Sequence, residues 1–442
     1  MKLIRTTDNN CGKPISKLGN GNFEDLSFIA NKKIYDINLV DNTNLLIFPH
    51  NWQLGIHKSD RIFELSNDGI LTTNNIMGFI GYNETSLAIS SRFYSNGNDF
   101  FLHYMLCKIF GINVVNLDFP KGDIDIHDFL PYLFPSYLQD ALSQGLYKQY
   151  KRNQYNDANV KGVIDINRHI KINIPFAGKI AYTAREHSYD NPVTQLIRHT
   201  IEHLRNRVFG HSILTNNAEI RANVSQIEYA TPTYKRGEIQ KVIKSNLKIF
   251  NHPYFTKYKN LQKLCLQILR GEKTTYGEKD KIHGLLFDGS WLWEEYVATI
   301  LKDKGIEHRT TIKDYLFVKD EISQNQGIIP DFICPIKNTK NASFVGDAKY
   351  KHIDTNKNRE DYFQIISYMF RYSCNNGYLL FPFDKENKNA DFLKGRIRKI
   401  DNGNNCNIIE LGLNIPQNIG DFKDFKQTIK QNEQELLKKI EV

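Results

Sequence analysis

Two apolar runs in the last third of the chain carry charged residues where an ordinary buried strand carries none. The run GIIPDFICPI (327–336) contains Asp331, and the run FVGDAKYK (344–351) contains Asp347 and Lys349. Side chains alternate between the two faces of a strand, so Asp347 and Lys349 share one face. The polar link KNTKNA joins the two runs. This order predicts a hairpin that brings Asp331 beside Asp347.

Two carboxylates and an ammonium group on one sheet face are suited to metal-dependent phosphodiester chemistry. Carboxylate oxygens are preferred ligands of Mg²⁺, a bound metal ion activates water, and a nearby lysine orients that water or assists proton transfer. We therefore expect Asp331 and Asp347 to bind Mg²⁺, or Mn²⁺ in its place, and Lys349 to position the water. The alternative is an ion pair on a solvated sheet edge.

A predicted helix before the strand pair offers a third carboxylate. In SWLWEEYVATIL (290–301), a turn of 100° per residue puts Glu294 at the edge of the apolar sector and Glu295 on the opposite, solvent-facing side. We expect Glu294 to assist as an acidic ligand. The alternative is a carboxylate that only interacts favourably with the helix N-terminus.

A second predicted helix, REDYFQIISYMFRYS (359–373), follows the lysine. Its pattern separates an apolar face (Tyr362, Ile365, Ile366, Met369, Phe370) from a polar face (Asp361, Gln364, Tyr368, Arg371). Gln364 and Tyr368 are four residues apart and therefore adjacent on the helix surface. They could orient the DNA backbone or Lys349, and the alternative is an ordinary solvated stripe.

The chain changes character twice, which predicts an α+β multidomain protein of three regions. Residues 1–155 form a β-rich and then helical domain, 156–275 a mainly helical middle region, and 276–442 an α/β domain with a central mixed sheet flanked by helices. The boundaries are set by a polar stretch near residue 155 and by YGEKDKIHG around Tyr276. Among the expected elements are strands at 32–40, 44–50, 69–82 and 86–93, helices at 99–111 and 134–152, and a strand with a turn at 161–174.

Composition excludes few partners. The net charge of +9 over 442 residues is compatible with nucleic acid without requiring it. The six cysteines form no CxxC pair, which favours reduced thiols over a zinc site or disulfides. His199 and His203 lack a third ligand and are expected to pack or to be solvated. The chain contains no long apolar segment and no apolar leader, which predicts a cytoplasmic protein without a membrane partner.

The combination of PD, DxK and QxxxY with a Glu on an upstream helix resembles the PD-(D/E)xK nuclease superfamily. The finer resemblance is to the McrC family of McrBC-type restriction systems, including its relatives in LlaJI-like systems. LFDGSWLWEEYVATIL resembles that family's helix and aligns Glu294, and GIIPDFI and FVGDAKYK resemble its two active-site strands. GFIGYNETSLAISSRF, KGVIDINRHI and DNPVTQLIRHTIEHL resemble upstream segments more loosely, and SSRF departs from the Pro and Lys more frequent there.

The resemblance implies a Mg²⁺-dependent endonuclease that cuts double-stranded DNA together with an McrB-like AAA+ GTPase hexamer. The partner would recognise and translocate DNA, and this chain would dock on it through the N-terminal region, stimulate GTP hydrolysis and cut. Glu294, Asp331, Asp347 and Lys349 would be the catalytic residues, with Gln364 and Tyr368 in support. The chain has no GxxxxGK[ST] motif, so we expect it to bind no nucleotide by a P-loop. A non-catalytic GTPase activator and a stand-alone RecB-like repair nuclease remain as alternatives.

Overall fold

The structure is a computed structural model of the chain. It describes residues 2–32, 44–48, 61–83, 85–94, 99–109, 130–207, 210–215, 218–248, 250–270, 282–317, 327–352, 359–384, 395–401 and 405–441. The predicted strand at 32–40 and the predicted boundary at Tyr276 lie outside these residues, apart from Lys32.

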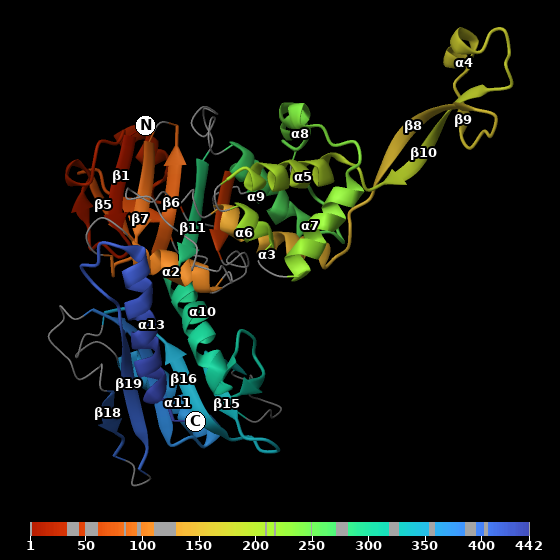
Figure 1. The fold of residues 1–442 in the computed structure, drawn as a ribbon. Helices are drawn as coiled ribbons and strands as arrows, with labels where there is room; N and C mark the ends of the chain where they lie inside the picture. The colour runs from red at the N-terminus through yellow and green to blue at the C-terminus, as the bar shows by residue number, and fades with distance from the viewer. Residues whose placement is uncertain are drawn as a thin grey trace. The chain divides into compact units, whose positions relative to one another are not determined.

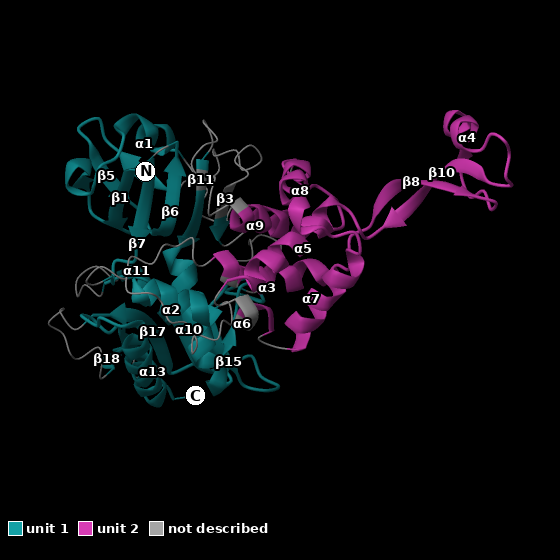
Figure 2. Ribbon diagram, turned by 45° about the horizontal axis from the view of Figure 1, so that its top comes forward, with its two compact units in different colours: residues 1–126, 278–442 teal, residues 127–277 magenta. Residues whose placement is uncertain are grey.

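The chain forms two compact units, coloured separately in Figure 2. Unit 1 combines residues 1–126 with 278–442, and unit 2 comprises residues 127–277. Within the described residues, no helix is both long enough and apolar enough to cross a membrane.

The first sheet of unit 1 has five strands in the order β1-β7-β6-β11-β3 (Figure 1). Their bounds are β1 Lys2–Thr7, β7 Thr85–Ser90, β6 Ile76–Tyr82, β11 Ile282–Asp288 and β3 Asn44–Phe48. All seven residues of β6 are buried, as expected for a central strand with a continuous apolar sequence. Gly78 in β6 has φ +125°, and a Cβ there would lie 2.0 Å from the Leu285 carbonyl oxygen of β11. Glycine therefore permits the close pairing of these two strands.

Smaller elements cover this sheet. They are the strands β2 Lys13–Pro14, β4 Phe63–Leu65 and β5 Ile70–Thr73, and the helix α1 Phe23–Ile29, whereas the helix α2 Phe100–Ile109 packs against α10 and α13. The core between them contains Ile4, Leu26, Phe63, Leu87 and Leu286, each no more than 1% exposed.

The second sheet of unit 1 has six strands in the order β12-β15-β16-β17-β19-β18. Their bounds are β12 Glu307–His308, β15 Phe332–Pro335, β16 Ala342–Ala348, β17 Asn376–Phe383, β19 Asn407–Asn414 and β18 Arg396–Lys399. The sheet is mixed, because β16, β17 and β19 run parallel while the remaining pairs are antiparallel. A separate two-stranded pair joins β13 Asp314–Tyr315 to β14 Gly327–Ile328.

Helices lie on both faces of the six-stranded sheet (Figure 1). They are α10 Gly289–Leu301, α11 Arg359–Tyr372 and α13 Phe422–Lys438. Val345 and Leu379 share a core with residues of α11. Phe344 and Tyr378 stack on the opposite face at 4.7 Å between ring centroids, and the Tyr378 hydroxyl accepts a hydrogen bond from the backbone N–H of Glu441, just beyond α13. The odd-numbered residues of β16 therefore face α11.

Unit 2 is a helical body with a projecting β-hairpin (Figure 1). Its helices are α3 Leu130–Leu142, α5 Pro192–Arg205, α6 Gly210–Thr215, α7 Ala218–Ala230, α8 Ile239–Ser245 and α9 Tyr258–Arg270. Helix α5 begins as the sequence predicts, with Pro192 in its first turn behind the capping residue Asn191.

The hairpin pairs β8 Gln149–Asp157 with β10 Ile180–Ser188 over nine residue pairs. Its tip holds the short strand β9 Val163–Ile164 and the helix α4 Ile166–Ile172. The expected helix over 134–152 is therefore wrong beyond Leu142, because the chain extends into β8. The strand and turn expected at 161–174 is wrong for its second half, where Asp165 caps α4 by accepting from the Arg168 N–H.

The mixed α and β composition of the structure agrees with the expected fold class. The expected boundary near residue 155 falls inside β8, whereas the other boundary adjoins the end of unit 2 at residue 277. The three-part division into domains stays a prediction.

Candidate active site

The predicted hairpin forms and brings the two aspartates together. Strands β15 and β16 are antiparallel, with Phe332 opposite Gly346, so Asp331 enters the hairpin next to Asp347. The Asp331 Oδ2 atom accepts a hydrogen bond of 2.7 Å from the backbone N–H of Ala348. The contact fixes one carboxylate oxygen of Asp331 at the end of β16.

Lys349 lies at the centre of a chain of polar contacts. Its Nζ atom forms an ion pair with Asp347, which is 1% exposed, and donates a hydrogen bond of 2.8 Å to Gln364 Oε1. Gln364 Nε2 donates to the Tyr368 hydroxyl at 2.9 Å, and that hydroxyl donates to the Ile329 carbonyl oxygen at 2.9 Å. The pair expected from four-residue spacing on α11 therefore holds the lysine side chain through Gln364.

Burial and like charges shape the pKa values of this cluster. Burial raises the pKa of Asp331 well above its usual range, and the charges of Asp347 and Glu294 raise it further. Burial also raises the pKa of Asp347, although Lys349 opposes the shift. Burial lowers the pKa of Lys349, but Asp347, Asp331 and Asp361 outweigh it and leave that pKa above its ordinary value. Lys349 is therefore a charged hydrogen-bond donor at neutral pH.

The charge of Glu294, on α10, acts on Asp331, and a histidine contacts the Glu294 carboxylate. His308 Nε2 lies 2.8 Å from Glu294 Oε1, and His308 Nδ1 lies 4.0 Å from Glu295 Oε2. Burial lowers the pKa of His308, but the hydrogen bond and charge of Glu294 raise it overall. The contact with Glu294 therefore favours the charged form of His308.

The expectation that Glu295 faces solvent is wrong. Its side chain is 29% exposed, close to the 27% of Glu294, and burial raises its pKa. Both carboxylates are partly covered because β12 brings His308 against this side of α10. Sequence reasoning missed His308, since β12 has only two residues and gives no periodic signal.

The predicted faces of α11 are also partly wrong. Asp361 and Tyr368, placed on a polar face, are 8% and 6% exposed, whereas Phe370, placed on the apolar face, is 82% exposed. The buried face is rotated by about 80° toward the polar residues relative to the predicted one. The reason is that Asp361 pairs with Lys351 and approaches Lys349 Nζ to 3.9 Å, so a charged residue is buried among partners.

The two aspartates fit a divalent cation such as Mg²⁺. Mg²⁺ is typically held by one or two carboxylates, with waters and substrate phosphates completing its octahedron. The like charges of Asp331 and Asp347 raise the pKa of Asp331, and a cation between them would relieve that repulsion. In the described ranges, no three His, Cys, Asp or Glu side chains converge as a ready metal site. Glu294 as a further ligand stays a prediction, because its carboxylate is engaged by His308.

Comparison with known proteins places the chain in a family. The family described as "McrBC 5-methylcytosine restriction system component" matches residues 71–382, which is more than half of the chain. No curated protein matches significantly. A chain in the refined half-complex from the tetradecameric assembly of Thermococcus gammatolerans McrB AAA+ hexamers with bound McrC is similar in fold. That match has a TM-score of 0.51 at 12% identity and covers 99% of this chain and 100% of the other.

The cryo-EM structure of the Thermococcus gammatolerans McrBC complex also matches, at 12% identity over 70% of this chain and 89% of that chain. Its TM-score of 0.35 is too low to support an argument about fold. The family match over residues 71–382 confirms the resemblance noted in the sequence. The chain belongs to the family of McrBC 5-methylcytosine restriction system components, as an McrC-like subunit.

Proposed function

We propose that this chain is the Mg²⁺-dependent DNA endonuclease of a restriction system and cuts foreign double-stranded DNA together with an McrB-like AAA+ GTPase. The observation that carries the proposal is the pair Asp331 and Asp347, of which Asp347 is buried and Asp331 partly buried, with Lys349 in contact with Asp347. These are the residues that a PD-(D/E)xK site requires, in a mixed sheet flanked by helices. A cytoplasmic location follows, because a restriction nuclease meets incoming DNA there.

Each residue has a distinct part in the proposed reaction. Asp331 and Asp347 would hold the metal ion, and Glu294 would assist from α10. The bound ion would supply an activated water and would stabilise negative charge on the phosphate. Lys349, charged because of its raised pKa, orients the attacking water and donates a hydrogen bond to the phosphate rather than removing a proton. Gln364 limits the positions open to the Lys349 ammonium group, with Tyr368 supporting the Gln364 amide.

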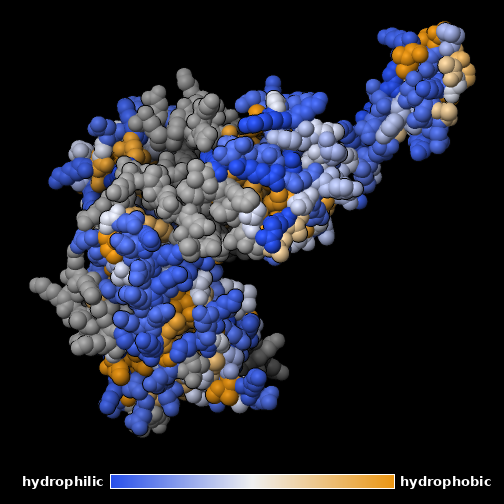
Figure 3. Space-filling model, in the orientation of Figure 1, coloured by the Kyte–Doolittle hydropathy of each residue, from blue (hydrophilic) through white to orange (hydrophobic). Residues whose placement is uncertain are grey.

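The tip of the β8–β10 hairpin is the surface we assign to the partner ring. Seven apolar side chains there are 48–78% exposed: Val163, Ile164, Ile166, Ile170, Ile172, Ile174 and Phe176. Figure 3 shows apolar residues gathered at this tip. Exposed apolar residues clustered this closely mark interaction sites. A structure described as McrB hexamers with bound McrC matches this chain in fold, which suggests the partner class.

The tip supplements the docking expected in the N-terminal region. Residues 1–155 include the start of the hairpin at Gln149. Docking by other parts of that region stays a prediction.

Reconstitution tests the proposed function. The chain is mixed with its AAA+ partner, GTP, Mg²⁺ and methylated or unmethylated plasmid DNA, and wild type is compared with Asp347→Ala and Lys349→Ala. We expect the wild type to cut and both variants to lose at least about 100-fold in rate while still stimulating GTP hydrolysis.

The alternatives give different results in the same assay. A non-catalytic adaptor would stimulate GTP hydrolysis without cutting any DNA. A stand-alone repair nuclease would cut without the partner and GTP. Cleavage by both variants at the wild-type rate would refute the assigned site residues.

A further inference from the structure

We propose that Arg92 is a positioning residue of the active site. From just beyond β7 in the N-terminal sheet, it fixes the segment directly after β16, which contains Lys349, and the start of α10, the helix that carries Glu294. The N-terminal sheet thereby completes the nuclease site. This inference rests on the proposed nuclease function and assigns a further residue to the same site.

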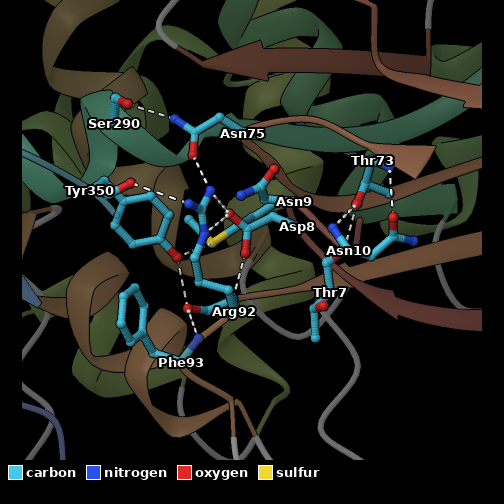
Figure 4. A network of polar contacts seen from close by, with 12 residues as sticks. Thr7, Asp8, Asn9, Asn10, Thr73, Asn75, Arg92, Phe93, Ser290 and Tyr350 are labelled. Atoms are coloured by element: carbon cyan, nitrogen blue, oxygen red, sulfur yellow. Dashed lines mark hydrogen bonds and ion pairs between the residues drawn. The ribbon is translucent and has the colours of Figure 1, made fainter. Parts of the chain in front are cut away.

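A buried ion pair anchors Arg92 in the N-terminal sheet (Figure 4). The side chains of Arg92 and Asp8 are 9% and 0% exposed. Arg92 Nε and Nη2 donate to Asp8 Oδ2 at 2.8 and 2.5 Å, and the Arg92 backbone N–H donates to Asp8 Oδ1 at 2.5 Å. Asp8 follows β1 and Arg92 follows β7, which are parallel neighbours. The guanidinium group is therefore held rigidly from one side.

The opposite side of the guanidinium group contacts the residue after Lys349. Arg92 Nη1 donates to the Tyr350 carbonyl oxygen at 3.4 Å, and the guanidinium carbon lies 4.7 Å from the centre of the Tyr350 ring. The Tyr350 hydroxyl lies 2.8 Å from Ser91 Oγ. The Lys349 N–H donates to the Leu380 carbonyl oxygen of β17 at 2.9 Å. The backbone is therefore fixed at Lys349 and at the next residue, which sets where the lysine side chain begins.

A second branch of the network reaches the helix that carries Glu294. Arg92 Nη2 donates to Asn75 Oδ1 at 2.5 Å (Figure 4). The Asn75 backbone carbonyl oxygen accepts from the Gly289 N–H at 2.8 Å, and Asn75 Nδ2 donates to Ser290 Oγ at 2.5 Å. Gly289 is the first residue of α10, so these contacts fix the start of the helix one turn before Glu294.

The contacts require the shape of arginine and not only its charge. A guanidinium group presents five N–H donors in a planar fork, whereas lysine is a point charge on a flexible stem. Arg92→Lys therefore keeps a positive charge beside Asp8 but cannot reach Asn75 and Tyr350 simultaneously. This substitution separates positioning from simple charge balance. Arg92→Ala would leave Asp8 buried without its partner and is the less informative change.

The test compares full-length Arg92→Lys with a matched control, Arg398→Lys. Arg398 Nε pairs with the fully buried Glu410 at 3.3 Å, on the opposite edge of the six-stranded sheet. Three quantities are measured with the AAA+ partner, GTP and Mg²⁺: the single-turnover rate of DNA cleavage, the stimulation of GTP hydrolysis, and DNA affinity. We expect Arg92→Lys to slow cleavage at least tenfold, with GTPase stimulation and DNA affinity within twofold of wild type. Arg398→Lys should leave all three within twofold.

Hydrogen exchange of the chain alone supplies a readout that does not depend on cleavage. We expect the amides of residues 349–351 to exchange at least tenfold faster in Arg92→Lys than in wild type, and to be unchanged in Arg398→Lys. Failure of wild type to cut DNA would refute the proposed function, and the exchange data would still decide the positioning role. Equal exchange in Arg92→Lys and wild type, or equal cleavage by the two variants, would overturn the inference.

Discussion

Asp331 lies near two other carboxylates, those of Asp347 and Glu294, and both raise its pKa beyond the effect of burial. A pKa raised in the folded state above that of the unfolded chain means that the ionised form destabilises the fold. The stabilising contribution is complete below about pH 4 and is lost as the pH rises through the folded-state pKa. At pH 8 without metal, the ionised form of Asp331, which metal binding would require, therefore lowers the stability of the fold.

Asp331→Asn should accordingly stabilise the metal-free protein at pH 8. The amide oxygen can still accept from the Ala348 N–H, while the repelling charge is gone. We expect a gain in the free energy of unfolding on the order of 1–2 kcal/mol at pH 8, shrinking toward pH 4, together with loss of cleavage. Urea unfolding of both proteins in EDTA at pH 8 and pH 4 measures this difference in the free energy of unfolding. A variant less stable than wild type at pH 8 would contradict the electrostatic account.

Glu294 and Glu295 are well matched for a comparison of substitutions. They have nearly equal exposure on one helix, but only Glu294 raises the pKa of Asp331. Glu294→Gln should lower the cleavage rate by about 10- to 100-fold, whereas Glu295→Gln should stay within about threefold. Rates are measured at saturating Mg²⁺ and again over a Mg²⁺ titration. Equal losses of cleavage rate in both variants would show that Glu294 has no special role in the site.

Sequence periodicity correctly predicted two of the pairings around Lys349. The two-residue period of a strand placed Asp347 and Lys349 on one face, and the helical spacing placed Gln364 beside Tyr368. Periodicity failed for Glu295 and for the buried face of α11, because their environments are set by His308 and by the lysines near Asp361. Such contacts between distant segments leave no periodic trace in the sequence.

At the scale of single elements, the start of α10 is closely packed near the site. A Cβ on Gly289 would lie 2.8 Å from Tyr350 Cε1 and 3.1 Å from Asn75 Oδ1. Gly289→Ala should cost about 1–3 kcal/mol in the free energy of unfolding, although alanine favours helices. Gly420→Ala is the control, because a Cβ there meets nothing within 4 Å. Equal midpoints of chemical unfolding for the two variants would show that the Tyr350 ring can move away from the added methyl group without loss of stability.

Helix α2 carries a pH-dependent cap. Asp99 accepts from the backbone N–H groups of Ser91 and Leu102 at 2.5 and 3.1 Å, but burial raises its pKa to about 7. The folded-state value exceeds the unfolded one, so Asp99 contributes stability below about pH 4 that is lost as the pH rises to about 7.

The corresponding variant is Asp99→Asn, which cannot ionise. Between pH 5 and pH 8, its stability should rise relative to wild type by on the order of 2 kcal/mol. Thermal or urea unfolding across this range, followed for both proteins in the same buffers, gives the difference. A constant difference between the two proteins would show that Asp99 has an ordinary pKa.

At the scale of the whole molecule, the exposed apolar tip of unit 2 is open to a direct test. Ile166 and Phe176 are 66% and 65% exposed, and Tyr229 on α7 is 91% exposed. Ile166→Asp with Phe176→Asp should reduce stimulation of the partner GTPase at least about tenfold. Tyr229→Asp should leave the stimulation of the partner GTPase unchanged. Each change should alter stability by no more than about 0.5 kcal/mol. Full stimulation by the tip variant would place partner docking elsewhere.

The strand β11 has a consequence for how the protein is made. It joins β6 in the first sheet, yet Ile282 follows Tyr82 by 200 residues. A ribosome adds about 5–20 residues per second, so β11 arrives on the order of 10–40 s after its neighbour. During that interval the apolar β6 is an open sheet edge, ready to pair with other nascent chains. Since α10 follows β11 directly, the strand that closes this edge also leads into the part of the chain that carries the candidate site.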